Sequence, residues 1–240
     1  MHEAEIEISV VLPAHNEAER IRNAVDQTQK ALATFASSFE IIIAEDGSTD
    51  GTAEIASRIE AENSFVKHIH SKARLGRGKA LNHAFKHAKG EILIYMDVDL
   101  STDLKYLKPL INAIKEERCD FATGSRMLKD SEVKRSFKRA AMSKVFNFLV
   151  RKILQSKICD HQCGFKSFRK DALMRLLNEI KDEHWFWDTE MLVRAQRHSY
   201  KIKEIPVRWE DRGGAGTKVN TFRDGLTMFY KILKLRCFPT

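Results

Sequence analysis

The most constraining feature of this sequence is a continuous apolar run, Ile92-Leu93-Ile94-Tyr95-Met96, which is followed at once by Asp97-Val98-Asp99. An apolar run without polar alternation is typical of a parallel strand whose two faces are both buried. The run therefore predicts a strand inside a parallel sheet, and it places two carboxylates at the end of that strand.

The first half of the chain alternates β-rich runs with helical patterns, which implies a parallel, doubly wound α/β sheet. Strands are predicted at residues 6–12, 39–44, 65–69 and 121–124. Helices are predicted from Glu17 with Asn16 as N-cap, around Ile55 and Ile59, from Ala80, and over 103–117. The second half predicts helices over 137–154, 172–180 and 189–198, a strand at 201–207, and a final amphipathic helix through Phe222, Leu226, Phe229 and Leu233. No linker separates the halves, so we predict a single domain over residues 1–240.

Composition limits the class of protein. The 240 residues are 43% hydrophobic and 31% charged, as in an ordinary globular domain. The net charge of +8 indicates an anionic partner, which could be nucleic acid, a lipid phosphate surface or a nucleotide. The basic residues concentrate between Arg126 and Lys157, where only Asp130 and Glu132 oppose them.

The cysteines and the hydropathy pattern bear on the location of the protein in the cell. Cys159, His161 and Cys163 are closely spaced, so a metal site is an alternative, but reduced structural thiols are the favoured interpretation. The N-terminus lacks the pattern of a signal peptide. No apolar stretch approaches the ~18–20 residues that span a bilayer. We therefore expect a cytoplasmic protein, either soluble or peripheral on a membrane.

Acidic side chains follow three of the predicted strands: Glu17, Asp46, and the pair Asp97 and Asp99. Ligands of open α/β sheets gather at the carboxyl ends of strands. In extended backbone Asp97 and Asp99 point to the same side, and two converging carboxylates repel unless a cation or proton lies between them. Mg²⁺ or Mn²⁺ prefers such oxygen ligands and often shares them with substrate phosphates. The alternative is a solvated turn.

Two further segments could contact a nucleotide. The carboxylate of Asp46 can accept hydrogen bonds from a base or ribose, although Asp46-Gly47 is also a good turn former. Gly76-Arg77-Gly78-Lys79 is similar to a phosphate-binding loop but has neither the Walker spacing nor the dinucleotide fingerprint. A plain helix-entry loop is the alternative there.

Taken together, the motifs resemble the family 2 glycosyltransferases of GT-A fold, a Rossmann-like sheet flanked by helices. The resemblance rests on residues 10–17, 45–52, 75–80, 96–100 and 124–126, which match in order. Residues 160–166, 187–192 and 205–209 look like the polyprenyl-phosphate branch, in forms closest to the dolichyl-phosphate β-glucosyltransferases. The resemblance covers nearly the whole chain and divides the domain into a nucleotide-sugar half, 6–126, and an acceptor half, 127–240.

The resemblance implies roles for individual residues. Pro13, Ala14, Glu17 and Asp46 would line the base and ribose pocket, with Gly76 and Lys79 also on the nucleotide. Asp97 and Asp99 would hold the divalent cation; Ser101 stands where mannosyltransferases often carry a Gln ligand. The positions matched to the diphosphate or the acceptor phosphate are Arg126, Arg139, Arg212 and Lys218. Asp188 would orient the sugar or steer the acceptor, unless it is only a helix N-cap.

The implied reaction moves a hexose, glucose in preference, from a nucleotide sugar to polyprenyl (dolichyl) phosphate with inversion. UDP-glucose is the favoured donor and GDP-mannose the second. The apolar and basic residues of 137–154 and of the last helix could form an interfacial surface on the cytoplasmic face of a membrane, or an ordinary core-facing helix with a solvated basic side.

Other classes remain as alternatives. A family 2 transferase with a soluble saccharide acceptor would need a carboxylate base, for which Asp188 is the candidate. A sugar-1-phosphate nucleotidyltransferase should carry its Gly-rich loop after the first strand, where this chain has Pro13 and Ala14. A nucleic-acid-binding module is suggested by charge alone, without a recognised motif, and we expect no nucleic-acid partner. A catalytically inactive sugar-nucleotide sensor would not need the acidic strand ends.

Overall fold

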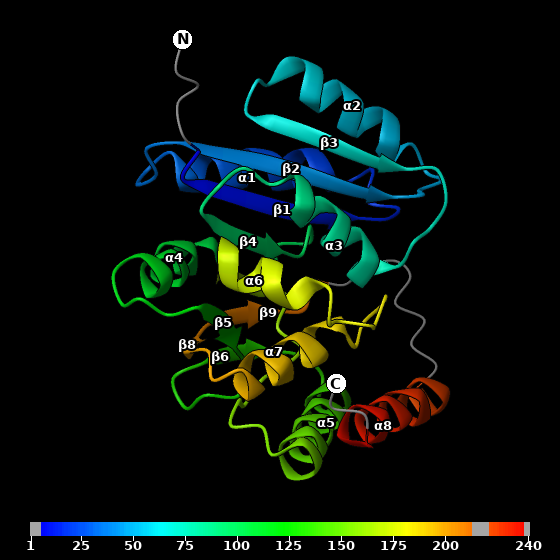
Figure 1. The fold of residues 1–240 in the computed structure, drawn as a ribbon. Coiled ribbons are helices and arrows are strands. Elements are labelled where there is room, and N and C mark those ends of the chain that lie inside the picture. Colours follow the sequence, from blue (N-terminus) through cyan, green and yellow to red (C-terminus); the bar gives the residue numbers. More distant parts are fainter. Residues whose placement is uncertain (1–5, 213–220, 238–240) are drawn as a thin grey trace.

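The structure is a computed structural model that describes residues 6–212 and 221–237, with the backbone alone for 221–224. A seven-stranded sheet forms its centre, in the order β3-β2-β1-β4-β7-β5-β8 (Figure 1). The strands are β1 (Ile8–Ala14), β2 (Phe39–Asp46), β3 (Val66–Ser71), β4 (Ile92–Met96), β5 (Phe121–Ser125), β7 (Phe165–Arg169) and β8 (Ile202–Pro206). The predicted α/β class, with a mostly parallel sheet flanked by helices, is confirmed.

One strand departs from the expected parallel arrangement. β7 runs antiparallel to both of its neighbours, β4 and β5, whereas the other pairings are parallel. The sheet is thus mostly parallel, and its antiparallel strand, at residues 165–169, is one that the sequence pattern did not predict. β7 follows the long helix α5 (Phe137–Leu154) and enters the sheet between two strands that were already present in the chain. Its arrival from the opposite edge brings the loop before Phe165 to the end of β4.

Helices cover both faces of the sheet, because consecutive strand residues point to opposite sides. On one face, Val10 and Ile43 pack with α1 (Ile21–Leu32), α2 (Thr52–Glu62) and α4 (Leu107–Lys115). On the other face, Val11 and Ile42 pack with α3 (Arg77–His87), α6 (Lys170–Leu177) and α7 (Trp187–Arg197). Each face thus has its own apolar core, and β4 is buried on both faces as predicted.

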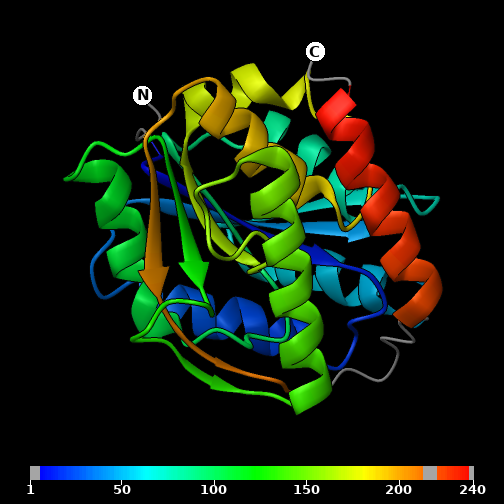
Figure 2. The same cartoon turned by 90° about the horizontal axis from the view of Figure 1, so that it is seen from below.

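A third, smaller core joins α5 to the last helix, α8 (Thr221–Cys237). Val150 and Leu154 of α5 pack with Ile232 and Leu235 of α8 and with Phe186 and Val193 near α7. The two helices lie side by side below the sheet in Figure 1 and remain together in Figure 2. The bounds of α5 agree with the predicted 137–154. Within the described ranges, no helix is long and apolar enough to cross a bilayer.

A second sheet of two short parallel strands, β6 (Glu132–Lys134) and β9 (Arg208–Glu210), lies beyond the main sheet. An isolated antiparallel bridge pairs Thr102 with Trp209 of β9. This bridge holds the segment after Asp99 against β9 and so fixes one wall of the cleft described below.

One predicted helix start is wrong, and one predicted helix is divided in two. Asn16 is not the N-cap of a helix: its φ is +57°, its Oδ1 accepts the N–H of Thr49, and α1 begins only at Ile21, after Arg20. Its side chain is used to tie two loops together, which a sequence pattern does not reveal. The helix predicted over 103–117 is shorter and split into a 3₁₀ turn, η1 (Leu104–Tyr106), capped by Asp103, and α4.

Candidate active site

The predicted acidic residues gather at the carboxyl edge of the sheet. β1, β2 and β4 are parallel neighbours, so Ala14, Asp46 and Asp97 stand at or just beyond the same edge. The N–H of Asp97 donates to the carbonyl of Gly164, at 3.1 Å. A Cβ at Gly164 would collide with the Asp97 carboxylate. A glycine is therefore required where the loop before β7 passes the end of β4, a role that the motif pattern alone did not assign.

The carboxylates of Glu17, Asp97 and Asp99 lie close enough to influence one another. Burial raises the pKa of Asp99, and the charge of Asp97 raises it further. Burial likewise raises the pKa of Glu17; the charge of Arg20 lowers it, whereas those of Asp99 and Asp97 raise it. The raised pKa values mean that burial and the neighbouring negative charges together outweigh the positive charge nearby. A cation would relieve the imbalance.

The donor atoms at this edge fit a hard divalent cation. Asp97 and Asp99 offer carboxylate oxygens, which Mg²⁺ and Mn²⁺ prefer. The Oγ of Ser101 is buried and has no hydrogen-bond partner among the described residues, while its N–H donates to Asp99 Oδ1 at 2.9 Å. An unsatisfied buried hydroxyl next to two carboxylates leaves an oxygen available to a cation or its water.

Asp46 holds the loop that precedes α3. Its buried carboxylate accepts the N–H of Leu75 at 2.5 Å and that of Gly76 at 3.0 Å. Gly76 has φ +97°, a backbone conformation that favours glycine. Asp46 and Gly76, both predicted on the nucleotide, are thus brought together by direct hydrogen bonds. A nucleotide contact from Asp46 would use carboxylate lone pairs beyond these two bonds.

Arg77 links the acidic edge to the interior and is a site residue that sequence reasoning missed. Its guanidinium donates to Asp97 Oδ1 at 2.5 Å and to Asp188 Oδ2 at 2.7 Å. It also lies over the rings of Tyr95 and Trp185, 5.1 Å from each centroid. The two carboxylates raise its pKa against the effect of burial. The signal was present in the Gly-Arg-Gly-Lys motif, but the partner Asp188 is 111 positions away.

Asp188 is buried and fully engaged. Besides Arg77, it accepts hydrogen bonds from the Tyr95 hydroxyl and from Lys166 Nζ, the latter at 2.8 Å. Burial raises the pKa of Asp188 to about 6 and lowers that of the equally buried Lys166 to about 7. The interpretation of Asp188 as a helix N-cap is wrong, because α7 begins at Trp187 after the N-cap Phe186. Asp188 instead organises a buried polar cluster.

The residues predicted to bind phosphate do not form one cluster: one of them is buried and others are exposed. Arg126 is largely buried, with Nε and Nη2 paired to the carboxylate of Asp160 at 2.7 and 2.9 Å. Arg139 forms an exposed ion pair with Asp211, and Lys79 forms one with Glu183. Lys218 lies outside the described residues. These pairings orient the basic side chains.

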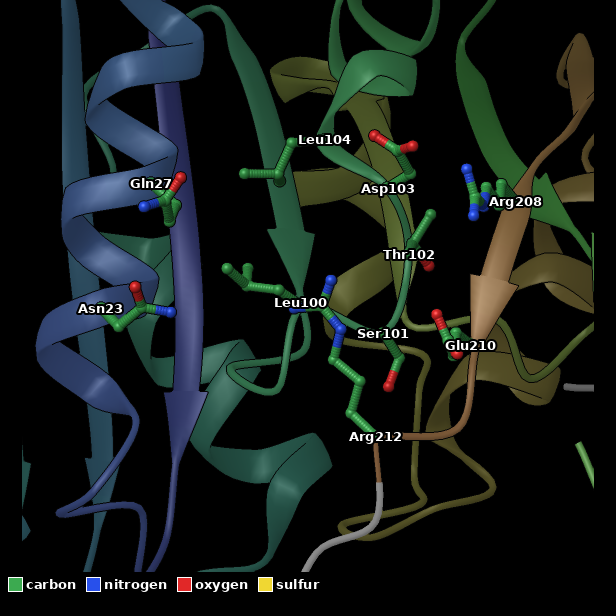
Figure 3. A pocket seen from close by; sticks show the side chains of 10 residues that line it. All are labelled: Asn23, Gln27, Leu100, Ser101, Thr102, Asp103, Leu104, Arg208, Glu210 and Arg212. Atoms are coloured by element: carbon green, nitrogen blue, oxygen red, sulfur yellow. The ribbon is translucent and has the colours of Figure 1, made fainter. Parts of the chain in front are cut away.

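Arg212 lines a cleft of about 460 Å³ beside the acidic edge. Figure 3 shows the cleft between α1, which contributes Asn23 and Gln27, and β9, with the segment from Leu100 to Leu104 in between. Ser101 and Arg208 also line it. Arg208 was not predicted, although it belongs to the Ile-Pro-Val-Arg-Trp motif. The cleft therefore combines two arginines with the hydroxyl next to the predicted metal ligands.

The cysteines hold no disulfide among the described residues, as predicted. Cys163 is buried, and burial raises the pKa of its thiol to about 11. Both nitrogens of His161 are engaged, Nε2 with Ser156 at 2.8 Å and Nδ1 with Asn147 at 2.8 Å. His161 thus has a structural role, and the alternative of a Cys-His-Cys metal site receives no support.

Comparison with known proteins gives a consistent result. Residues 9–177 match the family described as Glycosyl transferase family 2. Glycosyltransferase AglD of Haloferax volcanii is 48% identical over 233 residues, which are 96% of this chain and 37% of that protein. A dolichyl-phosphate beta-glucosyltransferase of Dictyostelium discoideum is 30% identical, over 96% of this chain and 74% of that protein. The chain thus spans little more than a third of the Haloferax relative.

Solved structures share the fold. Glucosyl-3-phosphoglycerate synthase from Mycobacterium tuberculosis, crystallised with Mn²⁺, UDP and phosphoglyceric acid, superposes with a TM-score of 0.72 at 18% identity, over 97% of this chain and 79% of that one. The Staphylococcus aureus protein TarS, crystallised with UDP-GlcNAc, superposes with a TM-score of 0.62 at 19% identity, over 96% and 65%. At such low identity the similarity shows a common architecture.

Proposed function

The chain belongs to glycosyl transferase family 2, and on that basis we propose that it transfers a hexose from a nucleotide sugar to polyprenyl (dolichyl) phosphate with inversion at the anomeric carbon. Glucose from UDP-glucose is the preferred substrate, and mannose from GDP-mannose is the second. The similarity to dolichyl-phosphate beta-glucosyltransferases supports this choice of acceptor and sugar.

The observation that carries the proposal is the burial of Asp188. A transferase that acts on a neutral hydroxyl acceptor needs a carboxylate base within reach of that hydroxyl. Asp188, the candidate base, is only 3% exposed and already binds Arg77, Tyr95 and Lys166. An acceptor that brings its own negative charge needs no such base. A phosphate monoester, with a second pKa near ~6, is largely dianionic at neutral pH.

The residues of the chain then have to position and neutralise two anionic substrates. Asp97 and Asp99 would hold Mg²⁺ or Mn²⁺, which stabilises the leaving nucleotide diphosphate when bound. Glu17, Pro13 and Ala14 would line the nucleotide pocket at the end of β1. Arg77 reaches Asp97 directly and so orients one of the two acidic ligands.

Positive charge on the acceptor side would come from Arg126, Arg139, Arg212 and Lys218. Arg212 and its neighbour Arg208 line the cleft that opens beside Ser101, which supports a phosphate position there. Arg126 is held rigidly by Asp160 and stacks over Trp209, with its guanidinium carbon 5.5 Å from the ring centroid. A guanidinium that is already oriented loses little entropy when it meets a phosphate.

The acceptor is a lipid, so part of the surface has to meet a membrane. Phe137, Val145 and Phe148 of α5 and Tyr230 of α8 are 89%, 59%, 58% and 64% exposed. They lie among lysines and arginines of the same helices, the combination that favours binding at an anionic lipid interface. We propose that this surface attaches the protein peripherally to the cytoplasmic face of a membrane.

A donor and acceptor screen tests the proposal. The chain is incubated with polyprenyl phosphate in membranes, Mg²⁺ or Mn²⁺, and UDP-glucose or GDP-mannose, and lipid products are analysed by mass spectrometry. We expect a glucosyl-phosphate lipid, formed fastest from UDP-glucose. Transfer to a soluble saccharide or to phosphoglyceric acid, with none to the lipid, would overturn the choice of acceptor.

Asp99→Asn tests the metal role within the same assay. We expect turnover to fall by about 10²-fold or more, because one of two carboxylate ligands loses its charge. Asp130→Asn, at an exposed position, serves as the matched control and should retain full activity. Circular dichroism of both variants checks that the fold is intact. Unchanged turnover in a folded Asp99→Asn variant would remove the assigned metal site.

A further inference from the structure

A second group of possible metal ligands lies on β2 and β3, and β1 lies between these strands and β4, which leads to Asp97 and Asp99. Glu45 is the penultimate residue of β2, and His68 and His70 belong to β3, the outermost strand on that side. The strand register pairs Glu45 with His70 and Ile43 with His68, so the three side chains share one face of the sheet. One ligand atom of each residue lies within 4.8 Å of the others.

The hydrogen bond between His70 and Glu45 accounts for the positions of these two side chains but not for that of His68. His70 Nδ1 lies 2.5 Å from Glu45 Oε2, and Ser48 N–H donates to Glu45 Oε1 at 2.5 Å. His68 Nδ1 meets the hydroxyl of Ser57 on α2, at 3.1 Å. The other nitrogen of His68, Nε2, is buried and has no hydrogen-bond partner in the part of the chain that the structure describes. Such an unsatisfied polar atom requires an explanation.

The charge states suit a metal ligand set. Burial lowers the pKa of His68, which favours its neutral imidazole. Burial alone would raise the pKa of Glu45, but the hydrogen bonds of Ser48 and His70 outweigh it and lower the value. The contacts of Ser48 N–H and His70 Nδ1 with its two oxygens favour the carboxylate form of Glu45. A neutral imidazole and a carboxylate are the forms in which these groups bind metal.

We infer that Glu45, His68 and His70 form a separate site for a transition-metal ion of the zinc class. Two imidazoles and one carboxylate are the ligand types that Zn²⁺ accepts, whereas the oxygen-only pair of Asp97 and Asp99 suits Mg²⁺ or Mn²⁺. Ser57 and Ser48 already hold His68 and Glu45 from behind, as outer-shell partners of metal ligands do.

The position of the site also allows an ion to enter from solvent and, once bound, to join two strands. The side chain of His70 is 45% exposed and can turn to admit the ion, while that of Glu45 is fully covered. Three protein ligands leave a fourth tetrahedral position for water. Because β3 is the last strand at this edge, an ion shared by β2 and β3 would fasten it to the sheet. The next residue, Asp46, holds the loop before α3.

Zinc titration of the full chain tests the inference, with Zn²⁺ alone as the probe and no nucleotide present. The background is the Asp97→Asn/Asp99→Asn variant, so that ions cannot bind at the other acidic pair. We expect one equivalent of Zn²⁺ to bind by calorimetry and to raise Tm. Adding His70→Ala should weaken binding by roughly tenfold or more, since even an outer-shell partner is worth 10–100-fold. Bound Co²⁺ should show visible d–d absorption that His70→Ala abolishes.

His198→Ala is the matched control, because His198 is also partly exposed and hydrogen-bonded to a glutamate, Glu179, at 2.9 Å. It should leave zinc affinity unchanged. A His83→Ala variant tests the neighbouring imidazoles of His83 and His87 on α3, whose rings lie 4.8 Å apart. The inference is overturned if no stoichiometric Zn²⁺ binds in the background variant. It is equally overturned if affinity falls with His83→Ala or His198→Ala rather than with His70→Ala. These outcomes are independent of any sugar transfer.

Discussion

At the scale of single residues, Arg77 connects the predicted metal ligands with the buried polar cluster. It contacts Asp97 at the edge and Asp188 in the interior, and Asp188 in turn binds Lys166 and Tyr95. Buried charges of this kind are stable only while they remain paired. The position of Asp97 therefore depends, through Arg77, on Asp188, which is far away in the sequence. A substitution at Arg77 should affect both carboxylates.

Arg77→Ala should destabilise the fold by about 3–5 kcal/mol, because it leaves Asp188 with one cationic partner in a buried site. Urea unfolding of the wild type, Arg77→Ala, Asp188→Asn and the double variant measures the coupling, which we expect to exceed about 1 kcal/mol. Lys79→Ala is the control: its ion pair with Glu183 is half exposed, so its loss should change stability by less than about 1 kcal/mol. Equal effects of the two variants would contradict the role of Arg77.

His161 gives the fold a specific sensitivity to acid. Burial lowers its pKa to about 3, whereas an unfolded histidine titrates near 6.5. Between these values the unfolded chain binds a proton that the folded protein does not, so stability is fully present above pH 6.5 and is lost as pH falls. The expected slope in this window is about 1.4 kcal/mol per pH unit.

In urea unfolding at pH 7, 6, 5 and 4, stability should fall more steeply with acid in the wild type than in His161→Gln, by up to this slope, because the variant cannot take up the proton. The raised pKa of Asp188 acts in the opposite direction in both proteins and cancels in the comparison. His184→Gln, at an exposed position, is the control and should follow the wild type. Parallel profiles for wild type and His161→Gln would mean that another group causes the acid sensitivity.

At the scale of elements, α5 and α8 form a layer of their own. They pack together through Val150, Leu154, Ile232 and Leu235 and leave large apolar side chains on their outer surfaces. The two helices already pack through one apolar side, so the exposed side chains of Phe148 and Tyr230 are not needed to hold them together. Their exposure is instead the property that the proposed lipid surface requires.

The double variant Phe148→Ser/Tyr230→Ser should therefore bind vesicles that contain anionic phospholipid several-fold more weakly than the wild type, by removal of buried apolar area at the interface. Co-sedimentation measures the binding, and Tm should not fall because both side chains are exposed. Lys108→Ser on α4, away from this layer, is the control. Undiminished binding of the double variant, or an equal loss with Lys108→Ser, would exclude α5 and α8 as the lipid surface.

At the scale of the whole molecule, three apolar cores share elements. The strands β1, β2 and β4 contribute to the cores on both faces, and α7 contributes to the core on one face and to that of α5 and α8. Because each core shares at least one element with another, unfolding of one core should destabilise the others. We expect the chain to unfold as one cooperative unit.

Truncation of one side chain in each core tests this. Ile43→Ala, Leu192→Ala and Ile232→Ala each remove a side chain that is fully buried and should cost about 2–5 kcal/mol. In urea, fluorescence and circular dichroism should report a single transition with the same m value in all variants. A separate early transition in Ile232→Ala would show instead that α5 and α8 unfold independently.

What the sequence determined by itself was local or periodic. The apolar run at 92–96, the bounds of α5 and the acidic residues at the strand ends follow from patterns within a few residues, and the ordered motifs identified the family before any contact was known. Hydrophobic period and turn chemistry are properties of neighbours along the chain, so they can be recognised without the fold.

Tertiary structure alone decided which distant side chains meet. Arg77 with Asp188, Arg126 with Asp160, and the antiparallel entry of β7 all depend on strand order and register, which set the contacts between residues far apart in the chain. The same holds for His68 and His70 beside Glu45. A charged residue in a motif shows that a partner is needed, but many residues of the right charge are available. Burial and geometry select among them, and neither is a property of sequence spacing.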